Sequence, residues 1–183
     1  QCLSVRGRGR EWRLEVRYTV EEIRQILSYL ANYSLYAYER EIRQGYLTLP
    51  GGHRLGLVGR AVLEGDRITS LTEISALNLR LAHEKKGCAD SVISCLWEQD
   101  NLCDTLVVSP PGGGKTTLLR DCIRQISNGT KEHRGRTVGV VDERSEIAGC
   151  CRGVPENDVG MRTDVLDGCP KTLGMRMLLR SMA

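Results

Sequence analysis

Three glycines followed by a lysine and two threonines have the clearest chemical meaning in this sequence. Residues 104–120 read DTLVVSPPGGGKTTLLR: an apolar run, a glycine-rich turn and then an amphipathic pattern. This order predicts a strand over Leu106–Val108, a tight loop over Ser109–Gly114 and a helix that begins near Lys115. A strand, a glycine-rich loop and a helix in this order are typical of a phosphate-binding site.

The residue types in the loop suit polyphosphate. Glycines let the backbone bend so that its N–H groups point at phosphate oxygens, and the helix start adds the positive end of its dipole. We expect Lys115 to contact the β- and γ-phosphates of ATP and the Thr116 hydroxyl to bind Mg²⁺. Ser109 stands where the motif G-x-x-x-x-G-K-[ST] has its first glycine. The expected nucleotide-binding residues are Ser109, Pro110, Pro111, Gly112, Gly113, Gly114, Lys115, Thr116 and Thr117.

Two acidic residues end the next apolar run. The pattern predicts a helix over Leu118–Ile126 and a buried strand over Thr137–Val141, followed by Asp142 and Glu143. A strand, a helix and a second strand form the unit of a parallel sheet, in which ligands bind at the carboxyl ends of the strands. We therefore expect Asp142 and Glu143 to lie beside the loop, where Mg²⁺ and an attacking water belong.

The composition is that of a globular protein without a strong charge bias. With 26 basic and 23 acidic residues, the net charge of +3 gives no strong signal for nucleic acid. The eight cysteines include no C-x-x-C pair, and no secretory signal precedes them, so we interpret them as free thiols of a cytosolic protein. The three histidines do not lie at zinc-ligand spacing from any cysteine pair. No apolar run reaches the roughly 20 residues that span a bilayer.

The chain divides into two expected domains. Residues 1–86 are predicted to form a small α+β domain, and residues 87–183 an α/β P-loop domain that a helix over Ala89–Trp97 introduces. Thr19 and Glu22 form the capping box of a helix. The first domain is expected to contain, in order, a solvated end (Gln1–Arg10), a half-buried strand (Trp12–Tyr18), two helices (Thr19–Leu30 and Leu35–Gln44) and an antiparallel sheet of three or four strands (Tyr46–Leu81).

Several longer segments resemble one protein family. Besides the loop, they are YSLYAYEREIRQGYLTLPGGHRLGLVGRAV, VVDERSEIAG and VPENDVGMRTDVLDGCPKTLGM, and together they extend over nearly the whole chain. They resemble the stage III sporulation protein AA family of endospore-forming bacteria, which is similar to the ATPases of type II and type IV secretion and pilus systems. The resemblance implies a RecA-like P-loop NTPase core that hydrolyses ATP as a ring motor, with a hexamer suspected. It also implies the cytoplasmic face of a membrane in the mother cell, and membrane-bound partners from the same operon.

The resemblance also implies roles for the acidic residues. Asp142 and Glu143 match an acidic box of the secretion ATPases, so we expect them to be catalytic together with Lys115. Glu143 is the expected base that orients water, with Asp142 or Glu146 as the alternative, and Asp142 is expected to join Thr116 at the metal. The family pattern continues into an apolar Walker B strand after the last residue, Ala183. We therefore expect a core truncated before that strand, with little hydrolysis by these residues alone.

Two other functions remain open at this stage. The arginine-rich start favours a nucleic-acid-associated RecA-like ATPase, and Ser109 favours a nucleotide-gated scaffold with little turnover. Ring ATPases complete their sites with an arginine from the next subunit. Arg60 and Arg80, on the predicted sheet, are the candidates for that role, although the pattern around each arginine alone slightly favours a surface arginine or an ion-pair partner.

Overall fold

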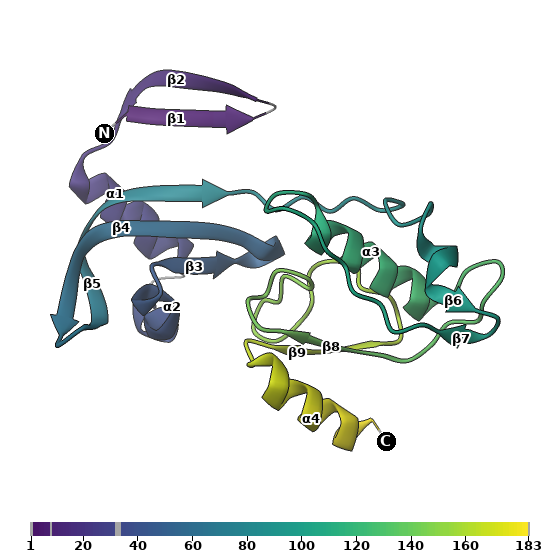
Figure 1. Cartoon of the computed structure of the whole chain (residues 1–183). Helices are drawn as coiled ribbons and strands as arrows, with labels where there is room; N and C mark the ends of the chain where they lie inside the picture. The colour runs from purple at the N-terminus through teal and green to yellow at the C-terminus, as the bar shows by residue number, and fades with distance from the viewer. Residues whose placement is uncertain (1, 8, 32–33, 183) are drawn as a thin grey trace. The chain divides into compact units, whose positions relative to one another are not determined.

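The computed structural model describes residues 2–7, 9–31 and 34–182, which form two compact units (Figure 1). The first unit comprises residues up to 49 together with 53–80, and the second comprises 50–52 together with the residues from 81 onward. None of the described helices is both long and apolar enough to cross a membrane.

The first unit begins with an exposed hairpin. Strands β1 (Cys2–Gly7) and β2 (Arg10–Arg17) pair antiparallel, so the predicted solvated end is exposed to solvent, with Val5 at 46%, but forms a paired strand. The prediction of a half-buried strand is wrong, because all of β2 is exposed, including Trp12 at 47%. The alternating pattern formed a strand as expected, but within the described part of the chain no second layer covers its apolar face.

Helices and a three-stranded sheet form the rest of the first unit. The capping box is confirmed: the Glu22 N–H donates to Thr19 Oγ1 at 3.2 Å and the Thr19 N–H donates to Glu22 Oε2 at 2.7 Å. Antiparallel β3, β4 and β5 pack on the helices around a core of leucine and isoleucine, which includes Leu47 and Leu55. The elements are α1 (Val20–Leu30), η1 (Leu35–Tyr38), α2 (Glu39–Arg43), β3 (Tyr46–Leu49), β4 (His53–Glu64) and β5 (Arg67–Arg80), with η2 (Pro50–Gly52) between β3 and β4.

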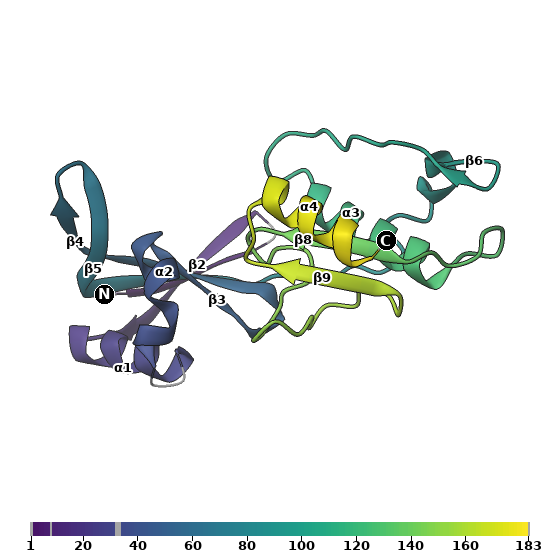
Figure 2. The ribbon, with the colours of Figure 1, turned by 90° about the horizontal axis from the view of Figure 1, so that it is seen from below.

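A parallel pair of strands lies at the centre of the second unit. Strands β8 (Val138–Asp142) and β9 (Thr163–Asp167) pair in register from Val138 opposite Thr163 to Asp142 opposite Asp167. Helix α3 (Lys115–Asn128) lies on one side of the pair and α4 (Lys171–Ser181) on the other (Figure 1). In the view from below the two helices overlap, as expected for opposite faces of one sheet (Figure 2).

Close packing holds α4 against the sheet. A Cβ on Gly174 would lie 2.5 Å from Cγ1 of Val141, so only glycine allows this approach. On the other side, Ile123 of α3 packs with Val140 and Ala148 in a small core. The remaining elements of this unit are η3 (Ile93–Leu96), β6 (Trp97–Glu98) and β7 (Asn101–Leu102).

Two predicted elements of the second unit are wrong. Residues 104–110 form no strand; Leu106 is 86% exposed and Val108 79% exposed. A strand needs a hydrogen-bonded neighbour, and this segment pairs with none of the described strands. The predicted helix over Ala89–Trp97 is a series of turns followed by η3, and the Ala89 N–H donates to the Asp121 carboxylate.

Candidate functional site

The glycine-rich loop leads directly into α3, which begins at Lys115 as predicted. Gly112 and Gly114 have φ angles of +75° and +82°, in the left-handed region that favours glycine. Gly113 is required for a different reason: a Cβ there would lie 2.5 Å from Ser109 Oγ and 3.1 Å from the Pro110 carbonyl oxygen. The loop therefore takes a tight course that side chains at these positions would disturb.

Lys115 folds back over this loop. Its ammonium donates to the carbonyl oxygens of Ser109 at 2.7 Å and Pro110 at 3.0 Å, and to Ser109 Oγ at 3.3 Å. The Gly113 N–H donates to the Pro110 carbonyl at 3.1 Å. The first N–H groups of α3 have no carbonyl partner within the helix, as at every helix start. A lysine and helix-start N–H groups around a glycine loop fit a polyphosphate.

A cleft of about 1090 Å³ brings the loop lysine and the acidic residues together. Lys115 and Thr116 line it from α3, and Asp142, Glu143 and Glu146 line it from the end of β8 and the loop that follows. Thr117 lies on α3 outside the cleft lining, and its carbonyl oxygen accepts from Cys88 Sγ at 3.5 Å. Positive and negative groups suited to phosphate, metal and water thus share one cavity.

Within this cavity Asp142 and Glu143 differ in their surroundings. Asp142 is 3% exposed, and its carboxylate accepts the N–H groups of Glu146, Ile147 and Ala148 at 2.8–3.0 Å. Glu143 is exposed to the cleft. Asp142 is therefore engaged in holding the loop over residues 143–148, which we call the acidic loop, while Glu143 faces the space in which a ligand would bind.

A second acidic residue at the sheet edge was not predicted. Asp167 ends β9 directly opposite Asp142, so two carboxylates meet at the carboxyl ends of the parallel pair. Burial raises the pKa of the Asp167 carboxyl, and the nearby negative charge of Asp142 raises it further. Its sequence signal was only a short TDVLD run, since the pairing with β8 joins segments about 25 residues apart.

Arg120 is the other residue that sequence reasoning missed. It lies on α3 and is only 6% exposed, and its guanidinium donates to the carbonyl oxygens of Ile147 at 2.5 Å and Glu146 at 2.6 Å. It also donates to the His83 carbonyl at 3.4 Å. Burial lowers the pKa of the Arg120 guanidinium. No short motif marks such a residue, because its partners are backbone atoms of a distant loop.

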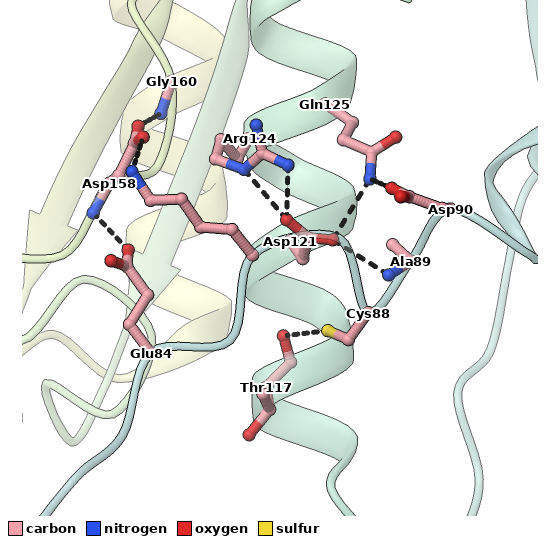
Figure 3. Close-up of polar contacts among 11 residues, drawn as sticks. Glu84, Cys88, Ala89, Asp90, Thr117, Asp121, Arg124, Gln125, Asp158 and Gly160 are labelled. Carbon is pink, nitrogen blue, oxygen red and sulfur yellow. Dashed lines mark hydrogen bonds and ion pairs between the residues drawn. The ribbon is translucent and has the colours of Figure 1, made fainter.

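Other residues of α3 hold a different segment, residues 88–90 (Figure 3). Asp121 accepts from the Ala89 N–H at 2.8 Å and from the Arg124 guanidinium at 2.6 and 2.8 Å, and Gln125 bridges it to Asp90. Burial opposes ionisation of Asp121, yet these hydrogen bonds outweigh it and lower the pKa of the carboxyl. Helix α3 therefore holds the acidic loop through Arg120 and the turn at Ala89 through Asp121.

Other sequence-based candidates are not among the residues that line this cleft. Arg60 on β4 lies 3.9 Å from Glu73, and Arg80 ends β5; both belong to the first unit. Seven cysteines within the described residues are free thiols, and burial raises the pKa of Cys150 to about 12. Among the described residues there is no group of three metal-binding side chains of the His, Cys, Asp or Glu type.

The geometry defines a candidate phosphate-binding site, and the comparisons with known proteins place the chain in a family. Residues 10–183 match the model of the family described as Sporulation stage III, protein AA, and the chain belongs to that family. It is 46% identical over 176 residues to the stage III sporulation protein AA of Bacillus subtilis (strain 168). The match covers 96% of this chain and 57% of that relative's length. No solved structure matches.

Proposed function

We propose that this chain forms the nucleotide-binding part of an ATP-hydrolysing motor that acts in sporulation. Membership of the sporulation family supports the process, and the cleft supports the chemistry. The observation that carries the proposal is the meeting of Lys115 and Thr116 with Glu143 in one cavity. The protein would work as a ring, suspected to be hexameric, on the cytoplasmic face of a mother-cell membrane with membrane-bound partners.

Each residue would have a distinct role in the reaction. Lys115 would leave the carbonyls of Ser109 and Pro110 and contact the β- and γ-phosphates, and the loop N–H groups would hold the remaining oxygens. Thr116 would hold Mg²⁺, which neutralises phosphate charge when bound. Phosphoryl transfer has a loose, highly anionic transition state, so positioning and charge neutralisation would supply most of the catalysis.

Glu143 would orient the attacking water. It is exposed in the cleft, so a water in line with the γ-phosphate could donate a proton to it. The Asp142 carboxylate already accepts three backbone N–H groups, and a direct place at the metal would require the acidic loop to open. Asp142 would therefore hold the acidic loop in place. Glu146, which also lines the cleft, is the alternative base.

Nucleotide titration tests the site. Lys115→Ala should weaken binding of a fluorescent ATP analogue by about 10–150-fold, because a hydrogen bond to a charged group contributes about 1.5–3 kcal/mol. Lys131→Ala is the matched control, since Lys131 is exposed in the same unit and does not line the cleft. Equal affinities of the Lys115 and Lys131 variants would place the nucleotide elsewhere.

Mixed oligomers test whether a neighbouring subunit completes the site. A Lys115→Ala subunit, inactive at its own loop, should restore hydrolysis to an Arg80→Ala subunit by offering its own arginine. An arginine supplied from a neighbour accelerates such reactions about 10³–10⁵-fold. Arg60→Ala is tested in the same way, although its approach to Glu73 also suits an ion pair. Full activity of the Arg60→Ala, Arg80→Ala double variant would rule out both residues.

A further inference from the structure

Side chains hydrogen-bond both the N–H groups and the carbonyl groups of the acidic loop. Asp142 accepts the N–H groups of Glu146, Ile147 and Ala148, and Arg120 donates to the carbonyl oxygens of Glu146 and Ile147. The Ala148 carbonyl accepts from the N–H groups of residues 156 and 157, at 3.2 and 3.0 Å. The peptide groups from Glu146 to Ala148 are thus fixed by a buried cation, a buried carboxylate and the following loop.

The loop also contains backbone strain that its contacts must stabilise. Ser145 is 7% exposed and has a φ of +53°, a left-handed conformation that costs free energy for a residue with a side chain. Its hydroxyl accepts from the Cys150 N–H at 2.9 Å and hydrogen-bonds Asp167. Such a conformation persists only where surrounding contacts over-determine it, and here they do.

Arg120 differs from the other anchors in its place on the chain. It lies about one and a half turns after Lys115 on the same helix, so its guanidinium joins the acidic loop to the helix that presents Lys115 and Thr116 to the cleft. The other anchors, Asp142 and Ser145, belong to the loop itself or its strand. Arg120 thus joins the acidic loop to the phosphate-binding helix by hydrogen bonds, in addition to the apolar contact of Ile123 with Val140 and Ala148.

We propose that Arg120 is a positioning residue that fixes the acidic loop, and with it Glu143 and Glu146, against the helix that begins with Lys115. This inference rests on the proposed ATP hydrolysis at the cleft. Arg120 does not line the cleft, so it acts through Glu143 and Glu146 and touches neither nucleotide nor water. Removing it should disturb the placement of the base and leave the phosphate-binding loop in place.

The test compares two residues of α3 in the intact protein. Arg120→Met should lower kcat for ATP hydrolysis by about 10–100-fold, the usual effect of losing a residue that orients a catalytic group. Its Kd for an ATP analogue should stay within about threefold of the wild type, because Lys115 and the loop remain. Arg124→Met is the control: Arg124 holds Asp121 and does not contact the acidic loop, so kcat should stay unchanged (Figure 3).

A conservative variant and a backbone readout keep the proposal open to refutation if Arg120→Met folds poorly. Arg120→Lys keeps the charge but cannot span two carbonyls, so it should restore only part of kcat. Hydrogen exchange at the amides of Glu146, Ile147 and Ala148 should be faster in Arg120→Lys than in wild type and unchanged in Arg124→Met.

Failure of this proposal is distinct from failure of the proposed function. Unchanged kcat and unchanged exchange in the Arg120 variants would overturn the positioning role while leaving ATP hydrolysis intact. A wild-type protein that neither binds nor hydrolyses ATP would overturn the proposed function. In that case the exchange measurement still decides whether Arg120 fixes the acidic loop, and unchanged exchange would refute it.

Discussion

Substituting Gly113 by alanine probes the described course of the glycine-rich loop. The added Cβ would lie 2.5 Å from Ser109 Oγ, 3.2 Å from Ser109 Cβ and 3.1 Å from the Pro110 carbonyl oxygen. Turning the Ser109 hydroxyl away would break its hydrogen bonds to Pro110 and Lys115. The close contacts of the added Cβ with Ser109 Cβ and with the Pro110 carbonyl oxygen would remain. The free loop could relieve the clash by moving, whereas the proposed phosphate site would need the described course, so the strain would appear as lost affinity.

The size of the effect follows from the packing. Overpacking of this kind costs about 1–3 kcal/mol, and about 1.4 kcal/mol corresponds to tenfold, so Gly113→Ala should weaken binding by about 5–150-fold. Ser109→Gly removes the closest contact, so the same alanine should cost less in that background. The coupling between the two positions should be about 0.5–2 kcal/mol, in the range seen for residues in contact.

The assay is titration of a fluorescent ATP analogue into wild type, both single variants and the double variant. Thermal unfolding of each variant serves as a control for global stability. A Gly113→Ala protein with wild-type affinity would show that the loop does not bind phosphate in this conformation. Equal losses from Gly113→Ala in both backgrounds would refute the contact between residues 109 and 113.

Three further predictions concern stability. Asp142→Asn should lower the free energy of unfolding by about 1–3 kcal/mol in urea titrations, because buried N–H groups lose a charged acceptor. The control Glu143→Gln, at an exposed position, should change the free energy of unfolding by less than about 0.5 kcal/mol. Equal losses of stability in the two variants would contradict the holding of the acidic loop by Asp142. The pKa of Asp121 is lowered in the folded state, so its stabilisation is present above the ordinary value of 3.8 and lost as pH falls through the lowered pKa. The difference in the free energy of unfolding between wild type and Asp121→Asn should therefore become smaller at acid pH. A difference that does not change with pH would show that the ionised Asp121 carboxylate does not stabilise the fold. Gly174→Ala should lower the melting temperature, since overpacking against Val141 costs about 1–3 kcal/mol; an unchanged value would show that α4 packs less closely.

Local sequence signals predicted the elements whose causes are local. The capping box at Thr19 and Glu22 forms as expected, and α3 begins at Lys115 and ends at Asn128, with Gly129 as its C-cap. The strand before Asp142 is also present. The groups that cap these two helices lie within a few residues of one another, so the sequence alone contains that information. Strand β8 shows its apolar pattern in the sequence, although its partner β9 lies about 25 residues further along the chain.

The elements that failed depend on distant partners. Leu106–Val108 has the composition of a strand but pairs with no described neighbour, and the turns around Ala89 are bonded to Asp121 on α3. The predicted apolar face of α3 is only partly right. Leu119 is 38% exposed, while Arg120 is among the buried residues of the helix. Polar residues beside the apolar face, such as Arg120 and Asp121, are also buried because they bind backbone groups of other segments, which periodicity does not reveal.

The candidate site also contains residues that the sequence predicted and one that it did not. The motif predicted Lys115 and Thr116, and the order of elements predicted that Asp142 and Glu143 would lie beside them in the cleft, where the structure has them. Their catalytic and metal-binding roles stay predictions. The tie between Arg120 and the acidic loop was not predictable, because its acceptors are carbonyl oxygens about 26 residues away along the chain.

Steady-state hydrolysis by the intact protein tests the central claim most directly. The wild type should hydrolyse ATP in a Mg²⁺-dependent reaction. Glu143→Gln should lower kcat by about 10²–10⁴-fold, the usual contribution of a general base, while the affinity for an ATP analogue stays near that of wild type. Wild-type turnover in Glu143→Gln would exclude Glu143 as the base, and a wild-type protein without any Mg²⁺-dependent hydrolysis would contradict the motor function.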